Sequence, residues 1–201
     1  MATDTYKTIS APAESLYKEK SSKFLIYAYP VLNEEQIRKH LEVLHKQHYD
    51  ATHHCYAWRL GFRGETFRAN DDGEPSSTAG KPILGQLLSN EVTNCLIVVV
   101  RYFGGTKLGV SGLIEAYRDS AAQVLQEADI VELTIDTTVT IDFSYMAMNS
   151  VMRIVKEDSP KILEQEFDNL CRMKLAIRES KAEMMISKLN KVEGCTLDIC
   201  E

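Results

Sequence analysis

The chain has 201 residues, 44% of them hydrophobic, which suffices for one large domain or two small ones with their own cores. Its formal net charge of −6 argues against a protein that coats nucleic acid non-specifically, although it is compatible with a local basic patch. The five cysteines form no CxxC pair, which argues against zinc and favours reduced thiols. Without a secretion signal or an apolar run long enough to span a bilayer, we expect a cytoplasmic protein with no membrane contact.

The first third of the chain predicts strands and one helix. A short strand is expected at residues 6–9, and a longer one at 16–31, whose second half is rich in β-forming residues. Asn33 then caps a helix that runs to about His48, because apolar residues recur there at helical spacing. Residues 54–69 follow as a hairpin around two glycines.

All five histidines lie within fifteen residues, directly before and at the start of this hairpin. A metal site needs several converging ligands, and the adjacent strand residues His53 and His54 point to opposite faces of a sheet. We therefore expect no metal. One of these two histidines, placed near the glycine loop described below, is a candidate ligand or proton carrier.

The stretch 71–82, DDGEPSSTAGKP, combines turn signals with hydroxyl groups ahead of an expected helix. One of the three hydroxyl residues is expected to cap that helix. The stretch also offers a carboxylate and an ammonium group, so it is a candidate phosphate-binding or acid–base cluster. Its candidate residues are Glu74, Ser76, Ser77, Thr78 and Lys81. Plain capping and turn formation explain the same residues equally well.

A second stretch, residues 95–113, reads as a buried strand, a glycine-rich loop and the start of a helix with Ser111 as its N-cap. Glycines bring unpaired N–H groups close to a ligand, and the helix dipole adds partial positive charge, so this order of elements can hold an anion. The candidate phosphate- or nucleic-acid-binding residues are Arg101, Gly104, Gly105, Lys107, Gly109, Ser111 and Gly112. The glycines fit neither a P-loop nor GxGxxG, and a purely structural turn is the alternative.

In the remainder of the chain, apolar and polar residues alternate at 132–143 and predict a strand. A helix, two strands, a second helix and a last strand are expected to follow, with the methionines as core filler. This βαββαβ order is ferredoxin-like. We therefore predict an α+β protein with an N-terminal domain at 1–128 and a ferredoxin-like C-terminal domain at 131–201.

The segments NDDGEPSSTAGKPIL (70–84) and VVVRYFGGTKLGVSGLIEAY (98–117) resemble the YigZ/IMPACT family, and HHCYAWRLG (53–61) matches its style. The resemblance covers residues 1 to about 128. It implies a bacterial YigZ-type member, with a βαβ first domain like a ribosomal protein and domain four of elongation factor G, and a second domain similar to another part of that factor. It also implies regulation of translation, with no established reaction and no cofactor.

The leading hypothesis is thus a non-enzymatic, translation-associated protein whose glycine loop contacts the phosphates of RNA or of a translation partner. One alternative is a small-molecule or nucleotide-binding enzyme of GHMP-kinase-like architecture, in which Glu74, Ser76, Ser77 and a nearby histidine transfer protons. Another is a pure protein–protein module with a structural glycine loop. No catalytic residue is assigned.

Overall fold

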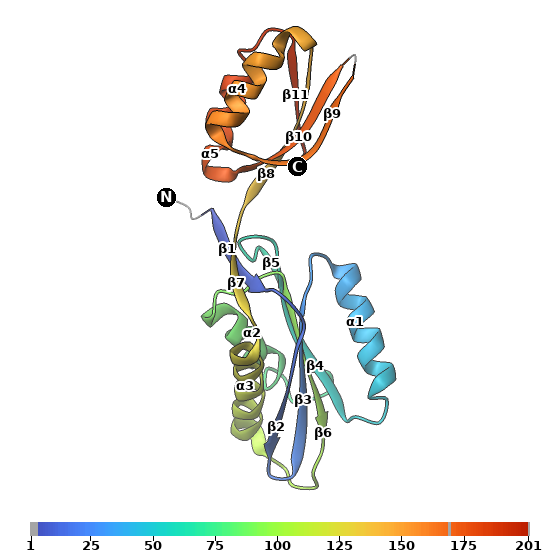
Figure 1. Cartoon of the computed structure of the whole chain (residues 1–201). Coiled ribbons are helices and arrows are strands. Elements are labelled where there is room, and N and C mark those ends of the chain that lie inside the picture. The colour runs from blue at the N-terminus through green and yellow to red at the C-terminus, as the bar shows by residue number, and fades with distance from the viewer. Residues whose placement is uncertain (1–3, 169, 201) are drawn as a thin grey trace. The chain divides into compact units, whose positions relative to one another are not determined.

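The computed structural model describes residues 4–168 and 170–200, which divide into two compact units (Figure 1). The larger unit comprises Tyr6–Leu133, and the smaller unit begins at Thr134 and also includes Asp4 and Thr5. Both units combine helices with strands, so the α+β class is confirmed. The division at 1–128 and 131–201 stays a prediction about which parts fold when they are expressed alone.

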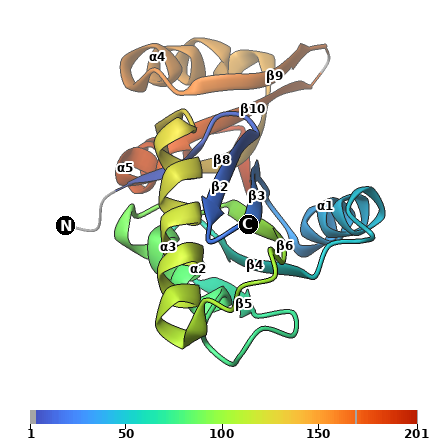
Figure 2. The same ribbon diagram turned by 90° about the horizontal axis from the view of Figure 1, so that it is seen from below.

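A five-stranded antiparallel sheet organises the larger unit, in the order β2-β3-β6-β4-β5. Its strands are β2 (Ala13–Glu19), β3 (Ser22–Pro30), β4 (His53–Leu60), β5 (Thr66–Asn70) and β6 (Cys95–Tyr102). Helix α1 (Glu34–Gln47) packs on one face, and α2 (Gly80–Ser89) and α3 (Gly109–Glu127) pack on the other, as Figure 1 and Figure 2 show. The central strand β6 is buried on both faces, as its unbroken apolar run predicts.

The single strand predicted at 16–31 is wrong, because β2 and β3 form a hairpin. Its two turn residues, Lys20 and Ser21, both have positive φ, 43° and 68°. Such a turn matches the twist of paired strands, but it is normally marked by glycine or asparagine. The sequence lacks that marker, so the hairpin was missed. The helix predicted from Asn33 is confirmed, and the Asn33 side chain accepts a hydrogen bond from the N–H of Gln36.

The strand predicted at 132–143 is divided between two sheets. Strand β7 (Ile130–Thr134) pairs with β1 (Thr5–Ile9) in a two-stranded sheet, whereas β8 (Asp136–Phe143) belongs to the smaller unit. Between them, Ile135 donates its N–H to the carbonyl of Asp4 and accepts a hydrogen bond from the N–H of Glu179. The alternation of apolar and polar residues continues through β7 and β8. The sequence pattern therefore does not indicate that these two strands belong to different sheets.

The smaller unit has the predicted ferredoxin-like topology. Its elements after β8 are a 3-10 turn η1 (Tyr145–Ala147), α4 (Met148–Asp158), β9 (Lys161–Phe167), β10 (Cys171–Arg178), α5 (Glu179–Leu189) and β11 (Cys195–Cys200). The strands form an antiparallel sheet in the order β11-β8-β10-β9, and α4 and α5 share one core with it. Each helix connects two parallel strands that are separated by a third, which is the split βαβ arrangement.

The methionines are core filler only in part. Met185 is fully buried, whereas Met146 and Met184 are 91% and 66% exposed, so the prediction is wrong for these two. A helical pattern with several adjacent methionines does not distinguish the buried from the exposed positions. The described cysteines Cys55, Cys95, Cys171 and Cys195 are free thiols.

Candidate functional site

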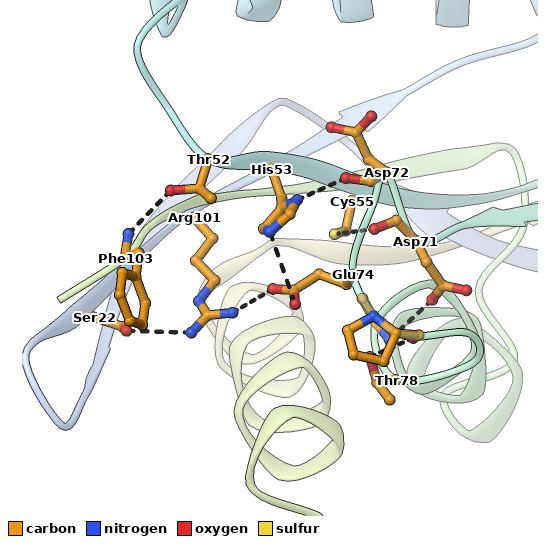
Figure 3. Close-up of polar contacts among 12 residues, drawn as sticks. Ser22, Thr52, His53, Cys55, Asp71, Asp72, Glu74, Thr78, Arg101 and Phe103 are labelled. Carbon is orange, nitrogen blue, oxygen red and sulfur yellow. Dashed lines mark hydrogen bonds and ion pairs between the residues drawn. The ribbon is translucent and has the colours of Figure 1, made fainter. Parts of the chain in front are cut away.

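The two motif stretches meet at one end of the five-stranded sheet. Arg101 near the end of β6 pairs with His53 at the start of β4, and Tyr102 pairs with Lys23 at the start of β3. The loop between β5 and α2 and the glycine loop between β6 and α3 both begin close to this end (Figure 3). Residues far apart in the sequence therefore share one small region.

A buried ion pair connects the two stretches. The guanidinium Nη1 of Arg101 lies 2.5 Å from Oε1 of Glu74, and the two side chains are only 6% and 4% exposed. The hydroxyl of Tyr117, on α3, donates a second hydrogen bond to the same oxygen at 2.8 Å. Because a buried charge is costly without a partner, this pairing strongly favours the observed loop positions.

Arg101, a predicted phosphate ligand, is thus buried and paired with Glu74. Its guanidinium carbon lies 5.5 Å from the ring centroid of Phe24 and 5.6 Å from that of Phe103. A weaker contact of 3.5 Å joins Nη2 to the Ser22 hydroxyl (Figure 3). Glu74 occupies Nη1, and the rings of Phe24 and Phe103 lie near the guanidinium group. Arg101 is therefore closed to solvent, and it holds the loop residues in position.

Tyr117 extends this buried cluster into the core. Burial, together with the neighbouring Cys55 and Glu74, raises the pKa of Tyr117 well above its ordinary value. The hydroxyl therefore stays protonated and donates to Glu74. The thiol of Cys55 lies 3.3 Å from the Tyr117 oxygen and 3.0 Å from the backbone oxygen of Asp71. Burial also raises the pKa of Cys55 strongly, so this thiol is not an activated nucleophile.

His53 approaches the cluster from β4. Its Nδ1 lies 2.7 Å from the backbone oxygen of Asp72, so this nitrogen carries the proton and donates. Its Nε2 lies 3.9 Å from Oε2 of Glu74. The structure thus brings the predicted carboxylate Glu74 together with one of the two candidate histidines. A histidine and a carboxylate in this arrangement can hold a proton between them.

His54 points to the opposite face of the sheet, as expected for adjacent strand residues. Its ring packs at 4.0 Å, centroid to centroid, against His45 of α1. Burial, with a further contribution from His45, lowers the pKa of His54. His54 is therefore not part of the cluster around Glu74. Among the described residues, no group of three or more histidine, cysteine, aspartate or glutamate side chains is arranged to hold a metal ion.

Helix α2 is capped by Asp71 and not by one of the predicted hydroxyl residues. The Asp71 carboxylate accepts hydrogen bonds from the N–H groups of Ser77, Ala79 and Gly80 at 2.8 to 3.0 Å. The hydroxyl of Thr78 instead donates to the carbonyl of Pro75. The first residue of DDGEPSSTAGKP therefore closes the loop across nine positions, a role that local capping rules do not describe. Ser76 and Lys81 are exposed.

The glycine loop has two kinds of glycine. A Cβ on Gly104 would lie 2.1 Å from the backbone carbon of Ser21, so only glycine allows the loop to pass this close to the β2–β3 turn. Gly105 and Gly109 instead have positive φ, 86° and 75°, with open space where a side chain would be. Helix α3 starts at Gly109 without a side-chain cap, so Ser111 lies within its first turn and is not its N-cap.

The backbone N–H groups of the glycine loop also differ from one another, in their hydrogen bonding. The N–H of Gly104 donates to the Ser22 hydroxyl at 3.3 Å. Across the described part of the chain, residues 105 to 108 donate no backbone hydrogen bond. Lys107 is exposed in the middle of this segment, and Gly112 follows in the first turn of α3. Of the predicted anion-binding residues, the structure thus groups Gly105, Lys107 and Gly109 on the surface and separates Arg101 from them.

The family model described as the Impact N-terminal domain matches residues 20–125, more than half of the chain and all of this region. The chain belongs to the IMPACT family. It is 30% identical to the IMPACT family member YigZ of Escherichia coli, over 90% of this chain and 89% of that protein. It is 28% identical to the IMPACT family member YvyE of Bacillus subtilis, over 98% of this chain and 91% of that protein.

A solved structure confirms the similarity at the level of the fold. A crystal structure described only as that of a hypothetical protein superposes with a TM-score of 0.72, at 28% identity. It covers 99% of this chain and 98% of the other. The predicted resemblance to the IMPACT family is therefore correct, and its relatives YigZ and YvyE are bacterial proteins. None of the described helices is both long and apolar enough to cross a membrane.

Proposed function

We propose that this IMPACT family member is a regulatory binding protein of translation, which acts in the cytoplasm and contacts RNA or a translation partner through the glycine loop. The translation role is the one that family membership implies. The contact itself is argued from the loop: it would hold a phosphate with backbone N–H groups and Lys107. The proposed function requires no covalent chemistry at the glycine loop.

One observation carries this proposal, which is the difference between the starts of α2 and α3. At α2, the carboxylate of Asp71 already occupies the N–H groups of Ala79 and Gly80. At α3, no side chain caps the helix, and the exposed residues before it include Lys107. Uncapped N–H groups at the positive end of a helix favour an anion, and a lysine adds a full charge. The α3 loop is therefore the better phosphate site of the two.

Within this proposal, the buried pair of Arg101 and Glu74 acts as a support. It fixes the end of β6, from which the glycine loop departs, and ties it to α3 through Tyr117. A loop that is held in place before binding loses less conformational entropy when the ligand arrives. Arg101 is thus a positioning residue for the phosphate, whereas Lys107 is the direct ligand.

Co-sedimentation with ribosomes across a salt series tests the proposal. Wild type should sediment with ribosomes at low salt and be released as salt rises. Lys107→Ala should bind more weakly, and the slope of log affinity against log salt should fall by about one unit if one phosphate contact is lost. Lys81→Ala is the matched control, because Lys81 is equally an exposed lysine of a motif loop, but next to the capped helix. Equal binding by wild type and Lys107→Ala would exclude the loop as the contact.

The pair formed by His53 and Glu74 favours a second candidate, an enzyme that moves a proton on a small phosphorylated molecule. Nε2 of His53 lies 3.9 Å from the Glu74 carboxylate, and Nδ1 of His53 is held by its hydrogen bond to the backbone oxygen of Asp72. A panel of phosphorylated metabolites incubated with wild type and His53→Gln, with products followed by mass spectrometry, discriminates the two functions. Turnover by wild type alone would establish the enzyme, and ribosome binding that is unchanged in His53→Gln would favour the binding protein.

A further inference from the structure

A hollow of about 520 Å³ lies beside the glycine loop, on the α1 face of the sheet. It is formed where the β2–β3 hairpin and the end of β6 come together, at the lower end of the larger unit in Figure 1. Its lining includes Leu16, Lys18, Lys23, Leu25, Tyr102 and Phe103. The volume falls within the range of about 300–1,000 Å³ that is common for small-molecule sites. The lining is apolar in the middle and positively charged at the hairpin.

Two lysines face each other across the hairpin. Lys18 and Lys23 are directly opposite in the β2–β3 register, and both are exposed. Like charges at paired positions destabilise a sheet. Within the described residues, neither lysine forms an ion pair with an acidic side chain. In a chain of net charge −6, this unneutralised pair favours an anionic ligand at the hairpin.

Phe103 supplies an exposed aromatic ring at the same hollow. Its side chain is 47% exposed although the backbone on both sides of it is fixed. Its N–H donates to the hydroxyl of Thr52 (Figure 3). The next N–H, that of Gly104, donates to the Ser22 hydroxyl. The backbone on either side of the ring is therefore fixed, the Arg101 guanidinium lies 5.6 Å from the ring centroid, and the rest of the ring is exposed at the surface. Such a fixed ring can stack on another at little entropic cost.

The floor of the hollow is also rigid. The hydroxyl of Tyr102 donates to the carboxylate of Asp50 at 3.1 Å and accepts a hydrogen bond from Nδ1 of His48 at 3.0 Å. The other nitrogen of His48 accepts a hydrogen bond from the Tyr27 hydroxyl at 2.8 Å. This chain of hydrogen bonds fixes the orientation of the His48 ring and the direction of Tyr102. The site thus exists before any ligand binds.

We propose that this hollow binds one nucleotide of a single-stranded RNA, with the base packed on Phe103 and Leu25 and the phosphate between Lys18 and Lys23. An inorganic anion would use the lysines but leave the ring and the aliphatic floor without a partner. A base attached to a phosphate satisfies both features. A duplex does not fit, because its bases are stacked inside the helix and cannot enter a hollow.

This inference rests on the proposed function, because it takes RNA as the partner. It adds a second contact beside the glycine loop: Phe103 and Gly105 are two residues apart, so a strand bound at Lys107 would reach the hollow with an adjacent nucleotide. The loop would bind phosphate alone, whereas the hollow would select unpaired bases. The glycine loop and the hollow therefore make separable contributions to binding.

Fluorescence anisotropy with a short fluorescein-labelled single-stranded oligouridine tests the hollow. Phe103→Ala should weaken binding about 5- to 150-fold, the range found for removal of one base–aromatic stack. The double variant Lys18→Ala/Lys23→Ala should lower the salt slope by about 0.7, the change expected for one phosphate of a single strand. Because both lysines are exposed, this double variant should fold even if the Phe103 variant does not. Phe67→Ala and Lys39→Ala are the controls, since they remove an exposed ring and an exposed lysine elsewhere.

Competition experiments distinguish the possible ligands, and the variants distinguish the hollow from the glycine loop. Uridine monophosphate should displace the labelled strand at concentrations at which inorganic phosphate and duplex RNA do not. Displacement by phosphate as effective as that by the nucleotide would overturn the inference. Loss of oligouridine binding in Lys107→Ala with no effect of the hollow variants would also overturn it, while leaving the proposed function intact. Ribosome binding without any oligouridine binding would have the same consequence.

Discussion

Arg101 and Glu74 lie 27 positions apart in the sequence, and they form an ion pair that is closed to solvent at the end of the sheet. The pair joins the two stretches on which the family resemblance rests, and the hydroxyl of Tyr117, at the end of the second stretch, donates to the same Glu74 oxygen. The glycine loop therefore begins at a fixed point, and its exposed part starts directly after it.

Removing one member of this pair should destabilise the protein strongly. Glu74→Gln leaves the Arg101 charge buried without a counter-charge, so we expect a loss of about 3–5 kcal/mol in the free energy of unfolding in urea. The double variant Glu74→Gln/Arg101→Met removes both charges and should cost less than the sum of the two single variants. Lys39→Ala, which breaks an exposed pair with Glu35, should change stability by less than about 0.5 kcal/mol. A loss under about 1 kcal/mol for Glu74→Gln would contradict a supporting role for the pair.

Asp71 should make stability depend on pH below neutrality. Burial raises its pKa, but the hydrogen bonds from the N–H groups of Ser77, Gly80 and Ala79 outweigh burial, so the pKa lies below its ordinary value. The unfolded chain therefore takes up the proton first. The stabilisation is full above the unfolded pKa and is lost as pH falls from there through the lower pKa of the folded state.

Asp71→Ala should accordingly cost about 0.5–2 kcal/mol near neutral pH, the usual range for an N-cap. Urea unfolding should show the difference from wild type shrinking between about pH 5 and pH 3. Asp119→Ala, an exposed aspartate of α3, serves as the control and should show no such convergence. A difference that stays constant over this range would show that the capping carboxylate keeps its unfolded pKa.

The two adjacent glycines of the loop should respond differently to alanine. Gly104→Ala places a Cβ against the backbone of Ser21 and should cost about 3 kcal/mol or more, because the hairpin has to move. Gly105→Ala meets no atom within 4 Å and suffers only from its positive φ, which costs about 1–2 kcal/mol. Urea unfolding of both variants measures the difference. Equal costs would show that the close approach at Gly104 relaxes freely.

The place of the domain boundary is tested by expressing two lengths of the first unit. A chain of residues 1–134 retains β7 as the partner of β1, whereas 1–128 loses it. We expect both to fold by circular dichroism, with the longer one more stable in urea and with a sharper transition. Residues 134–201 should fold alone, since they contain the whole four-stranded sheet. Unfolded fragments on both sides would show that one cooperative core spans the chain.

The sequence predicts what depends on regular patterns. The helix after Asn33, the buried strand β6 and the ferredoxin-like order follow from periodicity and composition. The sequence fails where a local rule is broken or where contacts are distant. The turn at Lys20 and Ser21 lacks the glycine or asparagine that normally marks two successive positive φ angles.

The buried cluster could be predicted only in part for the same reason. Glu74 and Arg101 stood out as charged residues within motifs, but nothing local indicates that they pair with each other and not with a ligand. Tyr117 reads as one more apolar position on α3, and only the fold shows that its hydroxyl has a role. The capping role of Asp71 was hidden because its three partners lie six to nine residues away. An aspartate at that distance from a helix is outside every local capping pattern.

Strand β1 is synthesised long before its partner β7. Its residues, Thr5–Ile9, pair with Ile130–Thr134, so the whole five-stranded sheet and its three helices lie between them in the sequence. While the chain is being made, that sheet has all of its strands before β7 exists. Contacts between such distant segments close large loops and form late. In a nascent chain, β1 therefore lacks its partner β7 until synthesis has passed residue 134, and during that interval its edge is open to pairing with other strands.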